Sequence, residues 1–239
     1  INWLNQQDHN FYIIEDNVQA SLNGNVGITG DYVINSYRKF LPQPDGAVLA
    51  YDKAMDWEAS PPDEEFISRK LIAKLIREEQ GNPAEFLKLF HDSESGIDQV
   101  IQPRLVSFLS RYLLTRTDLN EISAIRRSNF QYLLGLIKSR PSVQKLLSPL
   151  YDSLADGEVP LGLPVRVDPR IRDRLREHLL QYQIFCPVPW NITGSDTAGL
   201  FAEDYRLSRS ILTLPIDQRL DKSAVDFLFS RLADFFSES

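Results

Sequence analysis

The chain has 239 residues, of which 43% are hydrophobic and 25% are charged, so it is long enough for one large or two modest globular domains and is not broadly disordered. The formal net charge is −7 without a basic patch, which argues against a nucleic acid or an acidic membrane surface as partner. No apolar run approaches the roughly 20 residues of a membrane helix, and no secretory signal is visible. We therefore expect a cytoplasmic protein.

Cysteine and histidine usage makes a metal or disulfide site unexpected. The single cysteine, Cys186, excludes an internal disulfide and a cysteine-rich zinc site. The three histidines are far apart in the sequence and fit no ligand spacing, so we predict no metal. Cys186 itself is expected in a strand and turn over the core, not in a reactive thiol site.

The first third of the chain predicts three strands. Residues 11–14 form a continuous apolar run that is typical of a buried parallel strand, and Asp16 lies at its carboxyl end. Residues 32–37 are rich in aromatic and β-branched side chains, and residues 47–51 make a third short strand.

The middle of the chain is predicted to be helical. One helix runs from a cap at Asp63 to about residue 80, and another begins at Asn82-Pro83. A third is expected to open at Pro103 with an apolar stripe of Leu105, Phe108, Leu109 and Tyr112. Asp118 and Glu121 predict a cap for a long helix to Ser139, on which Arg126-Arg127 are expected to form a solvated face or a bridge to carboxylates.

The last third alternates between strands and helices, which favours α/β or α+β layers. The predicted strands cover residues 160–167, 184–186 and 211–215. The predicted helices follow the caps Asp168 and Asp221, and a further helix is expected over residues 198–208.

Chemistry-bearing residues collect after the first two strands. Asp16 follows one predicted strand, and Ser36, Arg38 and Lys39 follow the next. In open α/β sheets ligands bind beyond the carboxyl ends of the strands. An amine and a carboxylate there suit pyridoxal phosphate (PLP), which has a reactive aldehyde and a cationic ring nitrogen. The alternatives are an ordinary surface lysine and an aspartate that caps a turn.

Two segments carry a more specific resemblance. Residues 13–20, Ile-Ile-Glu-Asp-Asn-Val-Gln-Ala, resemble the (V/I)-I-E-D-x-x-Q-A segment of the DegT/DnrJ-type sugar aminotransferases, and residues 30–47 are similar to that family's strand, serine, lysine and Asp-Gly segment. The helix around Arg126 and the segment from Leu214-Pro215 to the end are similar more loosely. The resemblance implies an α/β fold: residues 1–115 as the incomplete PLP-binding large domain of a fold type I transferase, and residues 116–239 as the small C-terminal α/β domain.

The resemblance also implies a role for each matching residue. Lys39 would bond covalently to the cofactor and shuttle the proton during transamination, and Asp16 would pair with the pyridine nitrogen. Gln19 would lie near the phenolic oxygen of the ring, and Ser36 would bind the phosphate. The alternative for Gln19 is a surface amide on a helix, and the alternative for Ser36 is a buried strand hydroxyl.

The chain departs from the family pattern in two places. The three-residue step from Ser36 to Lys39 is shorter than the family's usual spacing, so Arg38 or a backbone amide is expected to help grip the phosphate. Only fifteen residues precede Asp16, whereas family members carry a long segment there that contributes to the cofactor pocket. We therefore expect a fragment or a truncated relative whose pocket is incomplete and which is inactive alone.

The expected function is PLP-dependent transfer of an amino group from an amino acid to a keto-sugar, nucleotide-linked, in sugar or polysaccharide biosynthesis. The family resemblance implies a homodimer. The alternative is an inactive or truncated relative that acts as a protein-interaction module. A dehydrating sugar enzyme on the same fold is disfavoured by Lys39, because such enzymes carry histidine there. The sequence does not indicate which sugar, nucleotide or amino donor is used.

Overall fold

A computed structural model describes residues 11–51, 58–79, 83–97, 102–192 and 200–237. The chain divides into two compact units: unit 1 comprises residues 1–21 and 25–118, and unit 2 comprises residues 22–24 and 119–239. None of the described helices is both long and apolar enough to cross a membrane.

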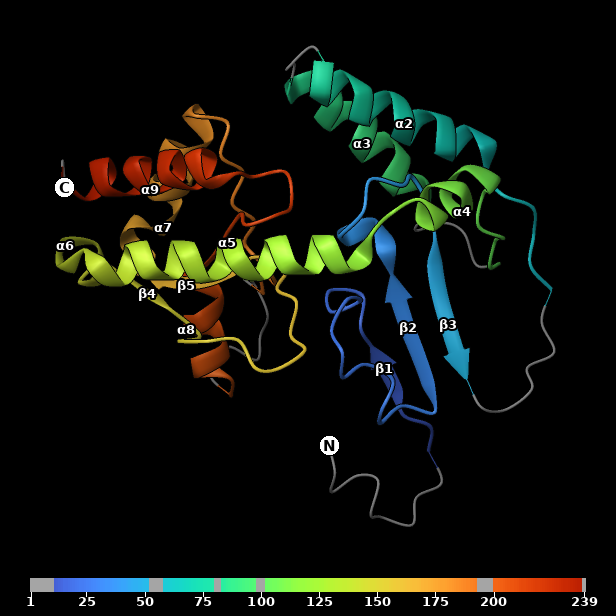
Figure 1. Cartoon of the computed structure of the whole chain (residues 1–239), viewed down its shortest axis with the longest axis horizontal. Helices are drawn as coiled ribbons and strands as arrows, with labels where there is room; N and C mark the ends of the chain where they lie inside the picture. The colour runs from blue at the N-terminus through green and yellow to red at the C-terminus, as the bar shows by residue number, and fades with distance from the viewer. Residues whose placement is uncertain (1–10, 52–57, 80–82, 98–101, 193–199, 238–239) are drawn as a thin grey trace. The chain divides into compact units, whose positions relative to one another are not determined.

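The described part of unit 1 combines a small mixed sheet with helices (Figure 1). Its elements are β1 (Ile14–Asp16), β2 (Tyr32–Ser36), the 3-10 turn η1 (Tyr37–Lys39), β3 (Ala47–Tyr51), α2 (Glu64–Glu79), α3 (Pro83–Ile97) and α4 (Phe108–Thr115). β1 pairs with β2 in parallel and β3 pairs with β2 antiparallel, so β2 is the central strand. The strands predicted over residues 32–37 and 47–51 and the parallel pairing are confirmed, whereas the first strand, expected over residues 11–14, covers Ile14–Asp16.

The strands of unit 1 bury little apolar surface. The expectation of a buried first strand is wrong, because Ile14 is 63% exposed. Even the central strand leaves Ile34 exposed, and Leu49 on β3 is exposed as well. A sheet becomes buried only when another layer covers its face, and the described part of unit 1 does not supply that layer for these residues.

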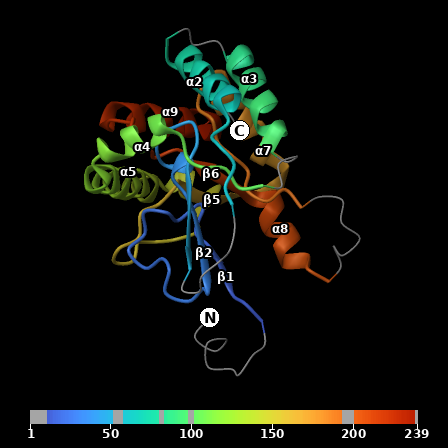
Figure 2. The ribbon, with the colours of Figure 1, turned by 90° about the vertical axis from the view of Figure 1, so that its right-hand side faces the viewer.

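Helices α2 and α4 begin where polar side chains cap them. Asp63 accepts a hydrogen bond from the backbone of Phe66 at 3.0 Å, which confirms it as the cap of α2. α2 and α3 lie side by side (Figures 1 and 2). The start predicted at Pro103 is wrong, because α4 begins only at Phe108, after the cap Ser107. Residues 103–105 are instead extended and exchange backbone hydrogen bonds with Ser60.

Unit 2 packs helices against an antiparallel sheet. Its elements are α5 (Leu119–Ser139), α6 (Pro141–Gln144), β4 (Leu147–Pro149), β5 (Leu163–Val167), α7 (Pro169–Gln181), α8 (Ala202–Ser210), β6 (Ile211–Leu214) and α9 (Lys222–Ser237). The strand order is β4-β5-β6, with both pairs antiparallel. α5 and α9 lie side by side in both views (Figures 1 and 2).

The core of unit 2 follows helical and strand periodicity. α5 buries Phe130, Leu133, Leu134 and Ile137, which lie on one face at i, i+3, i+4 and i+7. The remaining elements add the alternate residues of β5 and the inner faces of α7 and α9, for example Val165, Leu175, Leu179, Leu212, Val225, Leu228 and Leu232. Burial of these side chains supplies most of the hydrophobic stabilisation of the unit.

Two expectations for unit 2 need correction, and one strand was missed. Residues 184–186 form no strand, because Ile184 donates its backbone N–H to Leu179 at 3.0 Å and so closes the end of α7. β4 was not predicted from the sequence, since three residues that include a proline show no periodicity. The helix expected over 198–208 begins at Ala202 and ends at Ser210, and the first two residues of that expectation lie outside the described part.

Candidate functional site

The ends of β1 and β2 meet at one edge of the unit 1 sheet. The parallel register places Asp16 opposite Ile34, and β2 continues to Ser36 before the chain enters η1. Lys39 is the last residue of η1. The carboxylate after one strand and the amine after its parallel neighbour therefore lie at the same, carboxyl edge of the sheet, where open α/β sheets bind ligands.

Glu15 is fully engaged by the protein. Oε1 accepts hydrogen bonds from Asn17 Nδ2 and Gly27 N, each at 2.7 Å, and Oε2 accepts from Thr29 N and Gly30 N, each at 3.0 Å. The bond from Asn17 is the largest cause that lowers the pKa of Glu15; burial opposes it, and the three backbone bonds together bring the pKa to about 2. Glu15 thus holds residues 27–30 against β1.

Gly30 is required by this close approach. A Cβ at Gly30 would lie 2.6 Å from Glu15 Cβ and 2.7 Å from Tyr32 O, distances at which atoms overlap. The glycine in the Gly30-Asp31 pair therefore lets the loop reach Glu15. The side chain of Asp31 adds a second tie, because its Oδ2 accepts the backbone N–H of Ile13 at 2.8 Å.

Asp16 keeps most of its hydrogen-bonding capacity. Its side chain is exposed, and Oδ1 accepts one hydrogen bond, from Val18 N at 3.0 Å. This hydrogen bond is the turn cap that the sequence offered as the alternative role for Asp16. The second carboxylate oxygen makes no hydrogen bond with the described residues. Asp16 can therefore cap the turn and still accept a hydrogen bond from a protonated ring nitrogen.

Ser36 and Lys39 have free polar atoms within the described residues. Ser36 is buried and its hydroxyl has no hydrogen-bond partner there, while Lys39 is exposed and its amine has no hydrogen bond or ion pair there. Gln19 is exposed, and its amide is likewise unpaired among these residues. The four predicted site residues thus lie in one unit with capacity for a ligand.

Ser21 is a residue of this region that sequence reasoning missed. Its Oγ donates to Ser36 O at 3.0 Å and accepts from Ser36 N at 3.3 Å. The same hydroxyl lies 3.1 Å from Asn17 O. A serine two residues beyond Gln19 gives no sequence signal of its own, yet it ties the turn after β1 to the end of β2.

Asp45 and Gly46 have structural roles. Asp45 Oδ2 accepts from Ser107 N at 2.7 Å, and its Oδ1 accepts from the hydroxyls of Ser107, at 2.6 Å, and Ser110. Gly46 has φ of +115°, a backbone conformation that glycine adopts most readily. The Asp-Gly pair therefore docks α4 and turns the chain into β3.

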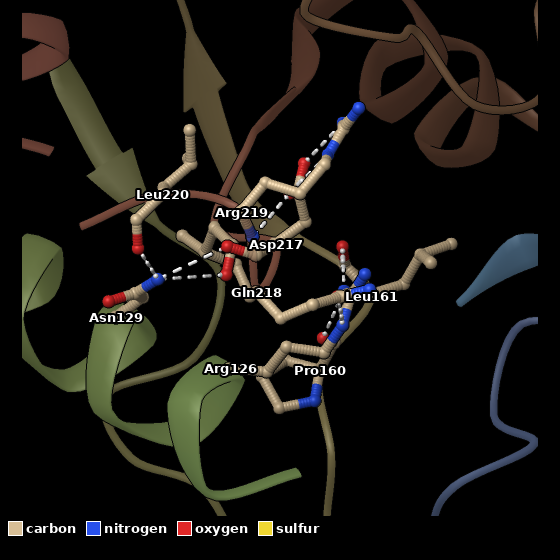
Figure 3. A network of polar contacts seen from close by, with 9 residues as sticks. Arg126, Asn129, Pro160, Leu161, Asp217, Gln218, Arg219 and Leu220 are labelled. Carbon is tan, nitrogen blue, oxygen red and sulfur yellow. Dashed lines mark hydrogen bonds and ion pairs between the residues drawn. The ribbon is translucent and has the colours of Figure 1, made fainter. Parts of the chain in front are cut away.

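A buried polar network organises unit 2 (Figure 3). Arg126 is 3% exposed, so the expectation of a solvated face is wrong for this residue. Its Nε donates to Gln218 Oε1 at 2.8 Å, and its Nη1 donates to the carbonyls of Pro160, at 3.2 Å, and Leu161, at 3.1 Å. Burial lowers the pKa of Arg126 to about 10, and the charge of Asp217 opposes that effect.

Asn129 and Arg127, which neighbour Arg126 on α5, differ from each other in burial. Asn129 is buried one turn further along α5, and its Nδ2 donates to Leu220 O at 2.9 Å and Asp217 O at 3.2 Å (Figure 3). Arg127 is only half-buried and donates to Ala155 O and Glu158 O. The basic pair on α5 therefore holds loops through carbonyl oxygens.

Two further predictions concern the reactivity of Cys186 and the possibility of a metal site. Cys186 is buried, and burial raises the pKa of its thiol to about 12, which agrees with the prediction of an unreactive position. Within the described ranges, no three His, Cys, Asp or Glu side chains are grouped closely enough to hold a metal ion.

Comparison with known proteins shows the fold. No protein-family model matches the sequence, and no curated protein matches it. Among solved structures, a DegT DnrJ EryC1 StrS aminotransferase from Brucella abortus is 16% identical with a TM-score of 0.56, and 94% of this chain covers 57% of that protein. PseC of Helicobacter pylori, an aminotransferase in pseudoaminic acid biosynthesis, is 13% identical with a TM-score of 0.59, and 96% of this chain covers 60% of it.

A third similar structure was solved with a cofactor. NtdA from Bacillus subtilis, with bound PMP, is 11% identical with a TM-score of 0.59, and 95% of this chain covers 51% of it. The chain thus has the α/β fold of these aminotransferases over nearly its whole length, which confirms the predicted fold class and, at the level of fold, the resemblance. It spans about half to three-fifths of the length of each.

Proposed function

We propose that this chain carries the lysine-bearing part of a PLP-dependent sugar aminotransferase. One observation carries the proposal: Lys39, whose amine has no partner among the described residues, and Asp16, whose carboxylate accepts one hydrogen bond among them, follow neighbouring parallel strands at their carboxyl ends, in a fold shared with aminotransferases. In this proposal unit 1 belongs to the PLP-binding large domain, and unit 2 is the small C-terminal domain.

The donor set of unit 1 fits the chemical groups of PLP. Lys39 offers an amine to the aldehyde, Asp16 offers a carboxylate to the ring nitrogen, and Ser36 offers a hydroxyl to the phosphate. Gln19 is available to the phenolic oxygen. When bound, the cofactor would supply a ring that withdraws electrons, and the carboxylate of Asp16 would keep its nitrogen protonated.

The chain's own residues would position and move a proton. Glu15, whose hydrogen bonds hold residues 27–30, fixes the end of β1 and with it the backbone of Asp16. The amine of Lys39 would act as the base that carries a proton between the carbon that loses the amino group and the carbon that gains it. We propose an amino acid as donor and a nucleotide-linked keto-sugar as acceptor.

A labelling experiment tests the proposal. Full-length protein is incubated with PLP, treated with borohydride to make the lysine–cofactor bond permanent, and digested for mass spectrometry. We expect the phosphopyridoxyl group on Lys39, with its loss in Lys39→Ala and no change in Lys88→Ala, whose lysine is exposed on α3. Labelling spread over exposed lysines, unaffected by Lys39→Ala, would contradict the proposal.

A protein-interaction module is the second candidate, favoured by the apolar residues on the sheet. Phe11, Tyr12 and Ile14 are more than half exposed, and Ile34 of the central strand is exposed too. Apolar surface of this kind marks interfaces. A homodimer, as the resemblance implies, also fits this surface, and light scattering on the full-length protein distinguishes a dimer from a monomer.

A further inference from the structure

A buried lysine lies close to the proposed cofactor lysine. Lys70, on α2, is 1% exposed, and its Nζ lies 3.3 Å from the centroid of the Phe90 ring and 5.6 Å from that of Phe66. A lysine is seldom buried unless its charge is paired, because removal from water is costly. The ion pair of Lys70 with Glu94, on α3, supplies that partner.

Glu94 joins this lysine to the turn that carries Lys39. The Glu94 Oε1 that pairs with Lys70 also accepts a hydrogen bond from Arg38 Nη1 at 2.9 Å. Arg38 is the residue directly before Lys39 in η1. The guanidinium of Arg38 additionally lies 5.8 Å from the Phe66 ring centroid of α2. One carboxylate thus connects both helices of the α2–α3 pair to η1.

The charges explain why the carboxylate stays ionised. Burial disfavours the charge on Glu94, but the hydrogen bond from Lys70 and the charge of Arg38 together lower the pKa of Glu94 below its ordinary value. Burial lowers the pKa of Lys70, Glu94 opposes that effect, and the charges of Arg38 and Lys39 add to it. Two cationic groups, Lys70 and Arg38, therefore share the one carboxylate of Glu94, so the charge of each depends on Glu94.

A second lysine of α2 holds the other side of Lys39. Lys74 lies one helical turn after Lys70, and its Nζ donates to Pro42 O at 2.5 Å and Gln43 O at 3.1 Å. Between these attachments, Phe40 and Leu41 are buried and Leu41 N donates to Tyr37 O at 2.8 Å. The backbone is thus attached to the helices both before and after Lys39.

We propose that Lys70, Glu94 and Lys74 are positioning residues, which hold residues 38–43 so that the exposed Lys39 amine keeps one place at the carboxyl edge of the sheet. This inference rests on the proposed function for its chemical consequence. It assigns a role to α2 and α3, which lie outside the segments that resemble the aminotransferase family. A fixed backbone narrows the region that the Lys39 amine can reach, and so raises the share of time that the amine spends near a bound cofactor.

The first test is independent of the cofactor. Amide hydrogen exchange of residues 37–43 is measured in the full-length protein for Glu94→Gln and Lys74→Met, with Glu65→Gln as control, because Glu65 forms an exposed pair with Arg69 on the same helix. We expect exchange to be about tenfold faster than in the wild type in Glu94→Gln and Lys74→Met, and unchanged in Glu65→Gln. Unchanged exchange in both variants overturns the inference, whatever the cofactor does.

The second test measures the chemistry. We expect the rate of PLP capture by Lys39 to fall about ten- to a hundredfold in Glu94→Gln at temperatures where the variant stays folded by circular dichroism. Because Arg38 acts through Glu94, the double variant Arg38→Met/Glu94→Gln should be no slower than the slower single variant. Capture at the wild-type rate in Glu94→Gln refutes the positioning role. Absence of capture in the wild type refutes the proposed function, and the exchange experiment then decides by itself whether Lys70, Glu94 and Lys74 hold residues 38–43.

Discussion

Replacing Arg126 by Met is expected to destabilise unit 2 by about 3 kcal/mol. Met preserves much of the apolar stem but leaves Gln218 Oε1 and the carbonyls of Pro160 and Leu161 without the guanidinium donors. Each bond from a charged donor contributes roughly 1.5–3 kcal/mol, and relief from burying the charge offsets part of the sum. With a urea slope of roughly 2 kcal/mol/M, the unfolding midpoint should fall by about 1.5 M.

Urea unfolding followed by circular dichroism measures this change, and amide exchange in α5 assigns the transition to unit 2. The matched control is Arg127→Met, which alters the next arginine on the same helix at a half-buried position and should cost less than about 1 kcal/mol. Arg126→Lys should lie between the two, because a single ammonium cannot span the acceptors of a guanidinium. Equal midpoints for Arg126→Met and Arg127→Met would refute the reasoning.

Three further predictions concern other positions. The pKa of Glu15 is about 2 in the folded state, below its ordinary 4.5, so its carboxylate stabilises the fold above about pH 4.5 and loses that effect as the pH falls toward 2. Glu15→Gln should therefore lower the free energy of unfolding by about 1 kcal/mol at pH 7 and should flatten its dependence on acid pH, as measured by unfolding curves in a pH series. Gly30→Ala should lower the melting temperature by several degrees more than Gly96→Ala in a thermal scan, since a Cβ at Gly30 would overlap Glu15 and Tyr32 whereas a Cβ at Gly96 meets nothing within 4 Å. Cys186 should resist a thiol reagent at pH 8 until urea unfolds the chain, and rapid labelling of the native protein would contradict its burial.

The elements that the sequence predicted well have strong local signals. Asp168 and Asp221 cap α7 and α9 as expected, because an aspartate at the N-cap satisfies backbone N–H groups without help from distant residues. The long helix to Ser139 was predicted for the same reason, with its apolar spacing as a second signal. Local hydrogen bonding and periodicity are properties of the sequence itself.

The missed features depend on contacts between distant residues. The helix expected to start at Pro103 starts at Phe108, because residues 103–105 exchange backbone hydrogen bonds with Ser60. Arg126 was expected to be solvated, but its buried position depends on acceptors at residues 160, 161 and 218. No window of sequence contains both partners, so neither outcome was available from local patterns.

The candidate site divides in the same way between what local sequence shows and what it does not. The four residues Asp16, Gln19, Ser36 and Lys39 were predicted from two short segments, and the parallel pairing of β1 with β2 places the ends of those segments at one edge. Ser21 and the Lys70–Glu94 pair gave no sequence signal, because their importance lies in which backbone they hold. The labelling experiment tests the role proposed for Lys39.

The adjacent carboxylates of Glu15 and Asp16 show how hydrogen bonding separates a structural residue from a candidate for chemistry. Successive side chains of a strand point to opposite faces, so the two groups meet different surroundings. Glu15 accepts four hydrogen bonds and has no capacity left, whereas Asp16 accepts one and is exposed. A ligand that needs a carboxylate at this edge can therefore be served by Asp16 alone of the pair, and removal of Glu15 should weaken the fold while removal of Asp16 should weaken ligand binding.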